Sequence, residues 1–289
     1  MRNLLVFMLF ASLFGCINVE QLQPVARYAV FCVLVPEDSV VAASVVRIIR
    51  VGERFTTDSL TVPGADVLLT NEIGDRLRLV YNARQRRYVA TNQSFVKVNQ
   101  RYRLVISFSD SKPMTASCTV PDVAPVLQLT GQVINDDYSF SAQWQDNPNR
   151  RNQYKLSPTL SAEANPNASG PLGGTATATP TSMVLFVSWD DSSASYLYVN
   201  DELTQTGQVL QRDGTIRRLS DVKKLILTLS LLNADRLFLD YDRLSLKQNG
   251  TEDDLLTRFS EPIELPSNIE NGLGVFCAYS RSTVKIQVK

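Results

Sequence analysis

The amino-acid sequence predicts an all-β protein with two β-sandwich domains of the immunoglobulin- or fibronectin-like kind and one short helix in the second domain. Three observations support this prediction. Residues 27–121 alternate between apolar and polar side chains with period two and are interrupted by turn residues, as in short strands. The same pattern resumes after Pro121 and Pro125, which mark a joint. The length of 289 residues suits two domains.

The first predicted domain covers residues 26–121. Residues 29–35 form a nearly continuous apolar run, which indicates a strand buried on both faces. In residues 101–109 the apolar side chains alternate with arginine and serine, which indicates one buried and one solvated face. Such a series of short strands is typical of an immunoglobulin-like sandwich. The predicted strands are 29–35, 45–51, 66–70, 76–81, 88–91, 101–109 and 114–120.

The second predicted domain covers residues 122–289. Residues 138–144 place alternate aromatic side chains on one face. Residues 162–180 are rich in Ala, Gly, Thr and Pro and carry no charge after Glu163, which predicts a flexible loop inside the domain. The predicted strands are 126–133, 138–144, 153–156, 183–189, 195–199, 208–211, 224–231, 274–280 and 283–288.

One helix is predicted at about residues 233–248. Leu237, Tyr241 and Leu244 are spaced i, i+4 and i+7 and would form one apolar stripe. Asn233 can cap the first turn, and Asn249–Gly250 can end the helix. The stripe is expected to cover an edge or an end of the second sheet.

The N-terminal residues have the order of a signal peptide. A short basic start is followed by an apolar run at residues 4–14, which is too short to span a bilayer. The run ends in Leu-Phe-Gly-Cys at residues 13–16, which resembles a bacterial lipobox. That resemblance implies a signal peptide at 1–15, a lipid on Cys16 and a tether at 16–25. The alternative is an ordinary secretory signal beside an unrelated cysteine.

Composition excludes several classes of function. The chain has no histidine, so it has no Ser-His-Asp triad, no HExxH zinc site and no imidazole base. It carries 29 basic and 29 acidic residues, and without residues 1–15 the net charge is −1. A neutral chain lacks the basic surface that nucleic-acid binding needs. No cofactor is predicted, and paired carboxylates are the remaining route to an acid–base enzyme such as a glycosidase.

Three cysteines follow Cys16, namely Cys32, Cys118 and Cys277. Cys32 and Cys118 lie in the first and last strands of the first domain, so an exported protein could bridge them with a disulfide. Alternatively, each is a small buried apolar residue. Their spacing does not predict a metal site. Calcium remains an open alternative at the Asp-rich residues 190–193 and 249–254.

Three further features have both a structural and a functional interpretation. Trp144 is in phase with the apolar face of its strand and is expected in the core, whereas Trp189 ends an apolar strand and is expected to be partly exposed, where it could stack on a sugar. The segment at residues 268–272 precedes the closing strands. It is either a turn required by the fold or a partner surface formed by Asn268, Glu270, Asn271 and Gly272.

The order of several short motifs resembles a known family. The chain is similar to the Bacteroidetes lipoproteins grouped as domain-of-unknown-function family 4249, from about Tyr28 to the C-terminus. The motifs are PGADV at 63–67, RY at 87–88, QRYRL at 100–104, TA at 115–116, VP at 120–121, WQD at 144–146, NQY at 152–154, NDEL at 200–203 and SNIENGLGVF at 267–276. The resemblance implies a cell-envelope lipoprotein, often encoded beside an outer-membrane TonB-dependent receptor.

These observations lead to three functional hypotheses. The first is a non-enzymatic protein held at the outer membrane by the lipid on Cys16, on its periplasmic or its cell-surface face. It would be a binding or scaffolding accessory to a TonB-dependent transporter. The second is a carbohydrate-binding lipoprotein or a carboxylate-based glycan hydrolase, which predicts a concave aromatic surface with two facing carboxylates. The third is a surface adhesion or structural module.

Overall fold

The computed structural model describes residues 28–49, 54, 56–109, 111–134, 137–164, 181–184, 187–189, 192–194, 196–200, 207–217, 222–249 and 264–288. In this part of the chain most regular structure is β-strand, with a short helix α2 (Thr57–Leu60) and a longer helix α3 (Arg236–Asn249). The all-β class is therefore confirmed. None of the helices among these residues has the length and apolar character needed to cross a bilayer.

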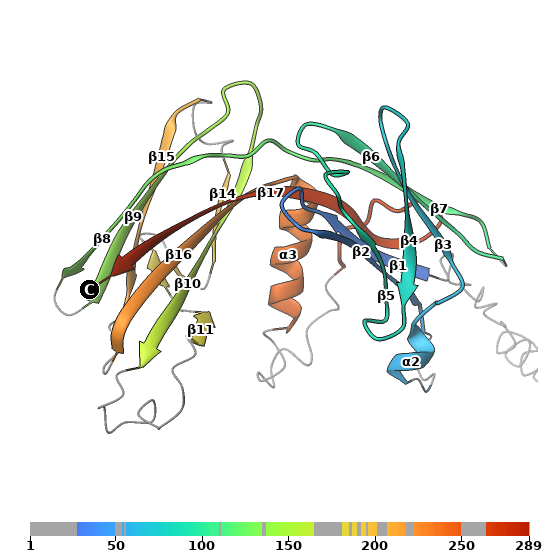
Figure 1. Ribbon diagram of the computed structural model, residues 1–289, viewed down its shortest axis with the longest axis horizontal. Helices are drawn as coiled ribbons and strands as arrows, with labels where there is room; N and C mark the ends of the chain where they lie inside the picture. The colour runs from blue at the N-terminus through green and yellow to red at the C-terminus, as the bar shows by residue number, and fades with distance from the viewer. Residues whose placement is uncertain are drawn as a thin grey trace, which may run out of the picture.

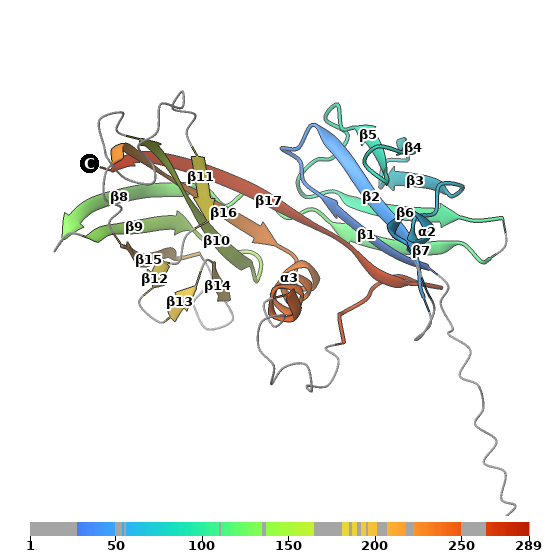
Figure 2. The ribbon, with the colours of Figure 1, turned by 90° about the horizontal axis from the view of Figure 1, so that it is seen from below.

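The described residues form an arch with two lobes (Figure 1). The first lobe holds strands β1–β7 and the second holds β8–β16. The C-terminal strand β17 (Leu273–Val288) runs through both lobes, and α3 lies beneath it in the hollow of the arch (Figures 1 and 2).

Seven strands build the first lobe, close to the predicted positions. In β6 the side chains of Tyr102, Leu104 and Ile106 are buried, while Arg101 and Arg103 are exposed, as the alternation predicted. The second strand begins five residues earlier than predicted, because Val40 and Val41 extend the pairing with β5. The strands are β1 (Tyr28–Leu34), β2 (Val40–Arg47), β3 (Asp66–Asn71), β4 (Arg76–Asn82), β5 (Arg87–Thr91), β6 (Arg101–Ser107) and β7 (Met114–Thr119).

The sheet of the first lobe curls around one apolar core. Its strand order is β1-β2-β5-β4-β3-β6-β7. Inward side chains from every one of these strands, such as Leu34, Leu69 and Ile106, form a single buried cluster. The curl brings β7 back toward the chain that precedes β17, where Thr115 and Glu270 form an antiparallel bridge.

The second lobe consists of two sheets packed face to face. Trp144 and Phe140 on one sheet pack with Leu156 and Leu229 on the other in a second buried cluster. One sheet has the order β13-β12-β15-β9-β8, and the other contains β11-β10-β16-β17 with β14 paired to β10. The strands are β8 (Val126–Ile134), β9 (Asp137–Gln145), β10 (Gln153–Ala164), β11 (Thr181–Val184), β12 (Val187–Trp189), β13 (Ser192–Ala194), β14 (Leu197–Asn200), β15 (Val209–Ile216) and β16 (Val222–Ala234).

Strand β17 differs from the prediction of two closing strands. It is a single strand of 16 residues. Residues 273–278 pair in parallel with β1, and residues 279–288 pair antiparallel with β16. The predicted break at residues 281–282 contains neither Gly nor Pro, and pairing with β16 continues through Arg281 and Ser282.

The path of β17 joins both lobes into one 12-stranded sheet. Phe276 and Ala278 belong to the core of the first lobe although they lie near the C-terminus. The predicted second domain, residues 122–289, is therefore not confined to the second lobe. Two separate immunoglobulin-like sandwiches are not confirmed.

Helix α3 begins later than predicted. It covers residues 236–249, and its N-cap is Asp235 rather than Asn233. The Asp235 carboxylate accepts a hydrogen bond from the Phe238 backbone N–H at 2.7 Å, in the usual N-cap geometry. Asn233 is instead the last but one residue of β16, where its buried amide donates to the Asp122 carbonyl. The predicted loop at 162–180 begins within β10, and its residues 165–180 lie outside the described part of the chain.

Candidate functional site

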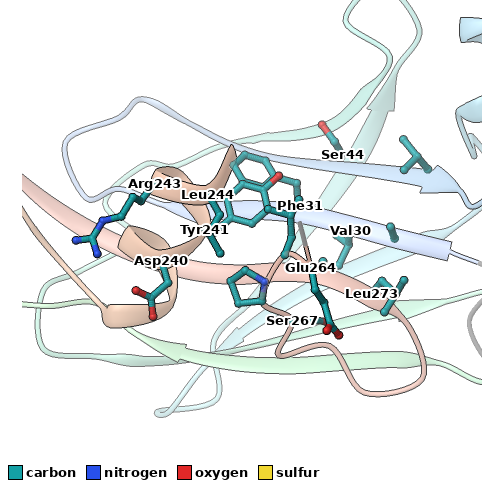
Figure 3. A pocket seen from close by; sticks show the side chains of 15 residues that line it. Val30, Phe31, Ser44, Asp240, Tyr241, Arg243, Leu244, Glu264, Ser267 and Leu273 are labelled. Carbon is teal, nitrogen blue, oxygen red and sulfur yellow. The ribbon is translucent and has the colours of Figure 1, made fainter. Parts of the chain in front are cut away.

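A groove with a volume of about 990 Å³ lies under the arch, and Figure 3 shows the side chains that line it. One wall is α3, and the other is the outer face of β17, β1 and β2. Residues 264–267 close one end. The walls are mainly apolar, from residues such as Ala29, Phe31, Val46, Leu244, Leu265 and Leu273.

The apolar wall results from the composition of β1. Val30, Cys32 and Leu34 point into the core of the first lobe, so Ala29, Phe31 and Val33 lie on the opposite face. The sequence predicted that both faces of this strand are buried. The outer face is only partly covered, because α3 packs over Val33 but contacts Phe31 through Tyr241 and leaves Phe31 partly exposed.

Three apolar side chains in the groove remain accessible. Phe31 is 39% exposed, Val46 is 36% exposed and Leu273 is 49% exposed. Leu273 pairs with Ala29, and Ala29 pairs with Val46, so the three strands present one continuous surface. A contiguous exposed apolar surface on a folded protein marks an interaction site more often than scattered apolar residues do.

An aromatic pair joins the two walls of the groove. The rings of Phe31 in β1 and Tyr241 in α3 lie 5.2 Å apart with an interplanar angle of 33°. Burial raises the pKa of the Tyr241 hydroxyl, which therefore stays protonated at neutral pH. The groove thus offers apolar surface and the hydroxyls of Tyr241, Ser44 and Ser267 rather than an ionised phenol.

The charged residues that border the groove differ in the partners that their side chains have. Asp240 forms an exposed ion pair with Arg236 at 3.4 Å, and Glu264 forms no hydrogen bond or ion pair with other described residues. Arg243 also borders the groove, but its guanidinium lies 4.8 Å from the ring centre of Tyr198. Figure 3 shows this guanidinium pointing away from Phe31 and Leu273. Of the three charged residues that line the groove, two are acidic, and the one basic side chain points away from the apolar floor.

Two side chains form hydrogen bonds with the backbone groups at the edge of β17 beside the groove. The Asn268 amide binds both backbone groups of Phe276, with N–H···O distances of 2.8 and 2.9 Å. The Asp235 carboxylate accepts the Ala278 N–H at 3.2 Å. A partner strand needs free backbone groups at a sheet edge. These contacts occupy them at residues 276 and 278, so the groove is not suited to strand addition here.

The four residues predicted as a partner surface close the first lobe. Glu270 exchanges backbone hydrogen bonds with Thr115, and its carboxylate accepts the Thr115 hydroxyl at 2.6 Å. The Asn271 amide donates to the Pro113 carbonyl at 3.0 Å. A Cβ at Gly272 would lie 2.1 Å from the Met114 sulfur, so a larger residue here would displace the buried Met114 side chain. The interpretation as a turn required by the fold accounts for these contacts.

Glu270 and Asn271 nevertheless remain exposed. Asn268 and Glu270 also border a shallow polar depression of about 480 Å³ beside Arg101 and Arg103. The partner surface at these residues stays a prediction.

The WQD and NQY motifs form a buried network in the second lobe. Asp146 is fully buried, and its carboxylate accepts hydrogen bonds from the Tyr154 hydroxyl at 2.6 Å and the Asn152 amide at 3.2 Å. The Gly207 N–H donates to its second oxygen at 2.9 Å. The ring of Trp144 packs edge-on against Tyr154, 5.7 Å between centres. Asp146 thus holds structure rather than facing a substrate.

The three cysteines among the described residues are free thiols. Cys32, Cys118 and Cys277 are all buried and unbridged, so the possible disulfide between Cys32 and Cys118 is not formed in this structure. Burial raises the pKa of the Cys32 thiol to about 12 and raises that of Cys118 well above its usual value. Both side chains belong to the apolar core of the first lobe, as the alternative interpretation had it.

The structure corrects one expectation about tryptophan. Trp189 was expected to be partly exposed, but it is only 5% exposed and packs edge-on against Phe140. Trp144 is in the core as predicted. Neither ring is a platform for a sugar.

Several acidic positions considered from the sequence lie outside the described residues. They include Asp190, Asp191 and residues 250–254. Within the described ranges, no three Cys, Asp or Glu side chains come together as metal ligands. Calcium binding at the two Asp-rich loops stays a prediction.

The sequence did not identify the groove residues as functional. A continuous apolar run at β1 was recognised, but the run alone cannot show which outward side chains α3 covers. The signal in the sequence was the apolar character of both faces of β1, which requires a second covering layer or a partner.

A search among curated proteins found no match. A family model described as "Domain of unknown function (DUF4249)" matches residues 17–285, which is most of the chain and includes both lobes, α3 and the groove. The chain therefore belongs to the DUF4249 family.

Proposed function

We propose that this protein is a lipid-anchored, non-enzymatic accessory of the cell envelope. Its body would bind or scaffold an outer-membrane TonB-dependent transporter, and the lipid on Cys16 would hold it at that membrane. The observation that carries the binding role is the groove between α3 and the outer face of β17, β1 and β2, where Phe31, Val46 and Leu273 remain exposed. Leaving such side chains in water is unfavourable, so a partner that covers them gains free energy.

The shape of the groove favours a macromolecular partner. Small-molecule sites enclose most of the ligand's surface. Here three apolar side chains of one groove are each at least one-third exposed. A wide and open apolar surface of this kind suits a segment of another polypeptide.

Two experiments test the proposal. Cys16→Ser should release the protein from the membrane fraction, and retention there would contradict the lipid anchor. Affinity purification from detergent-solubilised envelopes should recover a TonB-dependent receptor with the wild-type chain. Leu273→Glu should abolish that recovery, whereas Leu127→Glu, at a 54% exposed position in the second lobe, should not. Equal recovery with both variants would show that the groove is not the binding site.

A second candidate function is carbohydrate binding or hydrolysis. One observation favours it: the groove contains two aromatic rings, Phe31 and Tyr241, and two carboxylates, Asp240 and Glu264. A glycan array with the wild-type chain tests this function. Consistent glycan hits that disappear in Asp240→Asn and Glu264→Gln would favour it over the binding of a transporter.

A further inference from the structure

We infer that the groove recognises a polypeptide segment that combines an apolar or aromatic side chain with a lysine or arginine. This inference rests on the proposed function and specifies the chemistry of the partner. The apolar side chain would lie against Phe31 and Leu273, and the cation would lie at Glu264.

The first argument is the distribution of charge at the groove. Glu264 has no ionic partner among the described residues, and the Asp240 carboxylate is only weakly engaged by Arg236 at 3.4 Å. An exposed pair of this kind on one helix contributes little. Arg243 is held over the ring of Tyr198, whose hydroxyl donates to Asp242. Two carboxylates are thus available to a ligand, while the nearest cation is engaged elsewhere.

The second argument concerns how the segment can bind. Asn268 and Asp235 occupy the backbone groups of β17 at Phe276 and Ala278, so the segment cannot extend the sheet there. It must therefore be recognised by its side chains. The apolar floor supplies affinity, and the carboxylates at the rim select the charge of the partner and speed its association.

The third argument separates this site from the rest of the surface. Other strongly exposed apolar residues, such as Leu127 and Val209, lie on the second lobe outside any large cavity lined by carboxylates. The depression beside Arg101 and Arg103 is polar and bordered by both charges. Of these two cavities, only the groove combines a large apolar floor with a carboxylate, that of Glu264, that has no ionic partner among the described residues.

A random 12-residue peptide library displayed on phage is a suitable probe. It should be selected on the mature chain carrying Cys16→Ser, after depletion on the same chain carrying Leu273→Glu. Peptides that combine aromatic or large aliphatic residues with lysine or arginine should be enriched. The best peptide is then synthesised, and its dissociation constant is measured by calorimetry at low and high salt.

Two charge variants decide the result. Glu264→Lys should weaken binding about 5- to 10-fold at low salt and less at high salt, because the contact is electrostatic and screened. Glu72→Lys makes the same change at an exposed turn of the first lobe and should leave binding unchanged. Far-UV circular dichroism and urea unfolding of each variant check that the fold is retained.

The outcomes separate the two proposals. Groove-dependent peptides without basic residues, or equal affinity for Glu264→Lys, would overturn the charge preference and leave the groove as a binding site. If no enriched peptide loses binding to Leu273→Glu, or none is enriched, both this inference and the proposed polypeptide site fail.

Discussion

The side-chain amide of Asn268 hydrogen-bonds with both backbone groups of Phe276. Its Nδ2 donates to the Phe276 carbonyl at 2.8 Å, and its Oδ1 accepts the Phe276 N–H at 2.9 Å. One side chain thereby takes the place of a neighbouring strand at the edge of β17. The same nitrogen donates to the Ser117 carbonyl at 3.4 Å, which links β17 to β7. The curled sheet of the first lobe closes at this contact between β7 and β17, which we call the seam. Asn268 stabilises the seam by its hydrogen bonds to both strands.

Asn268→Ala should therefore lower the free energy of unfolding by about 2 kcal/mol, because buried backbone groups of Phe276 lose their partners. Urea unfolding measures the change. Gln143→Ala is the control, since it removes one exposed hydrogen bond to Gln211 in the second lobe and should cost less than about 1 kcal/mol. Equal losses for the two variants would contradict the role of Asn268 at the seam.

Gly274 is the position in β17 with the least room for a side chain. Its φ is +105°, and a Cβ would lie 1.9 Å from the Val30 carbonyl oxygen. Gly274→Ala must displace backbone and disturb the pairing of β17 with β1, so we expect a loss of at least about 3 kcal/mol in unfolding free energy. Gly64→Ala has no atom within 4 Å of the new Cβ and should change stability by less than about 0.5 kcal/mol. Chemical denaturation of both variants checks this, and a mild effect at Gly274 would show that the close approach is relieved easily.

The raised pKa of Asp235 leads us to expect that the stability of the folded protein depends on pH. Burial raises the pKa of its carboxyl, although the N–H groups of Phe238 and Ala278 act in the opposite direction. The folded protein therefore holds this proton more tightly than the unfolded chain. The resulting stabilisation is complete below the unfolded pKa of about 3.9 and is lost as pH rises through the higher folded value.

Asp235→Asn and Asp235→Ser both keep a residue that can cap α3 but cannot ionise. Urea unfolding between pH 4 and pH 7 should show that both variants lack the wild-type decrease in stability with rising pH. Identical pH profiles in all three proteins would mean that Asp235 does not contribute this dependence.

Because Cys32, Cys118 and Cys277 are buried and unbridged, we expect all three to be present as reduced thiols. Native Cys16→Ser protein at pH 8 should not react with a thiol reagent such as Ellman's, because burial both shields the thiols and raises their pKa. After unfolding in guanidinium chloride without reductant, three thiols should react. Finding a single reactive thiol would instead support a bridge between Cys32 and Cys118.

The local alternation of apolar and polar residues was sufficient to predict most strands. It was not sufficient to predict the strand that joins the two lobes. In β6 the alternation of arginine with apolar residues identifies the buried face, because successive side chains point to opposite faces of any strand. β17 was expected as two strands. Its continuity depends on pairing with β1 on one side and β16 on the other, and neither partner is near in sequence.

The position of the cap illustrates the same limit. Asn233 and Asp235 are both suitable N-caps by residue type. The structure selects Asp235, since pairing of β16 with β17 extends to Ala234 and places Asn233 inside the strand. Pairing with a neighbouring strand determines where β16 ends, and the end of β16 in turn determines where α3 can begin.

The sequence by itself determined the all-β class, most strands of the first lobe and the existence of one helix, because these follow from side-chain periodicity and turn residues. It also excluded histidine-based chemistry, since that depends on composition alone. Only the tertiary structure decided that the C-terminal strand joins both lobes and that α3 covers only part of Phe31 and leaves Leu273 exposed. Both depend on contacts between residues more than 200 positions apart, and the free energy of such packing has no counterpart in a local sequence pattern.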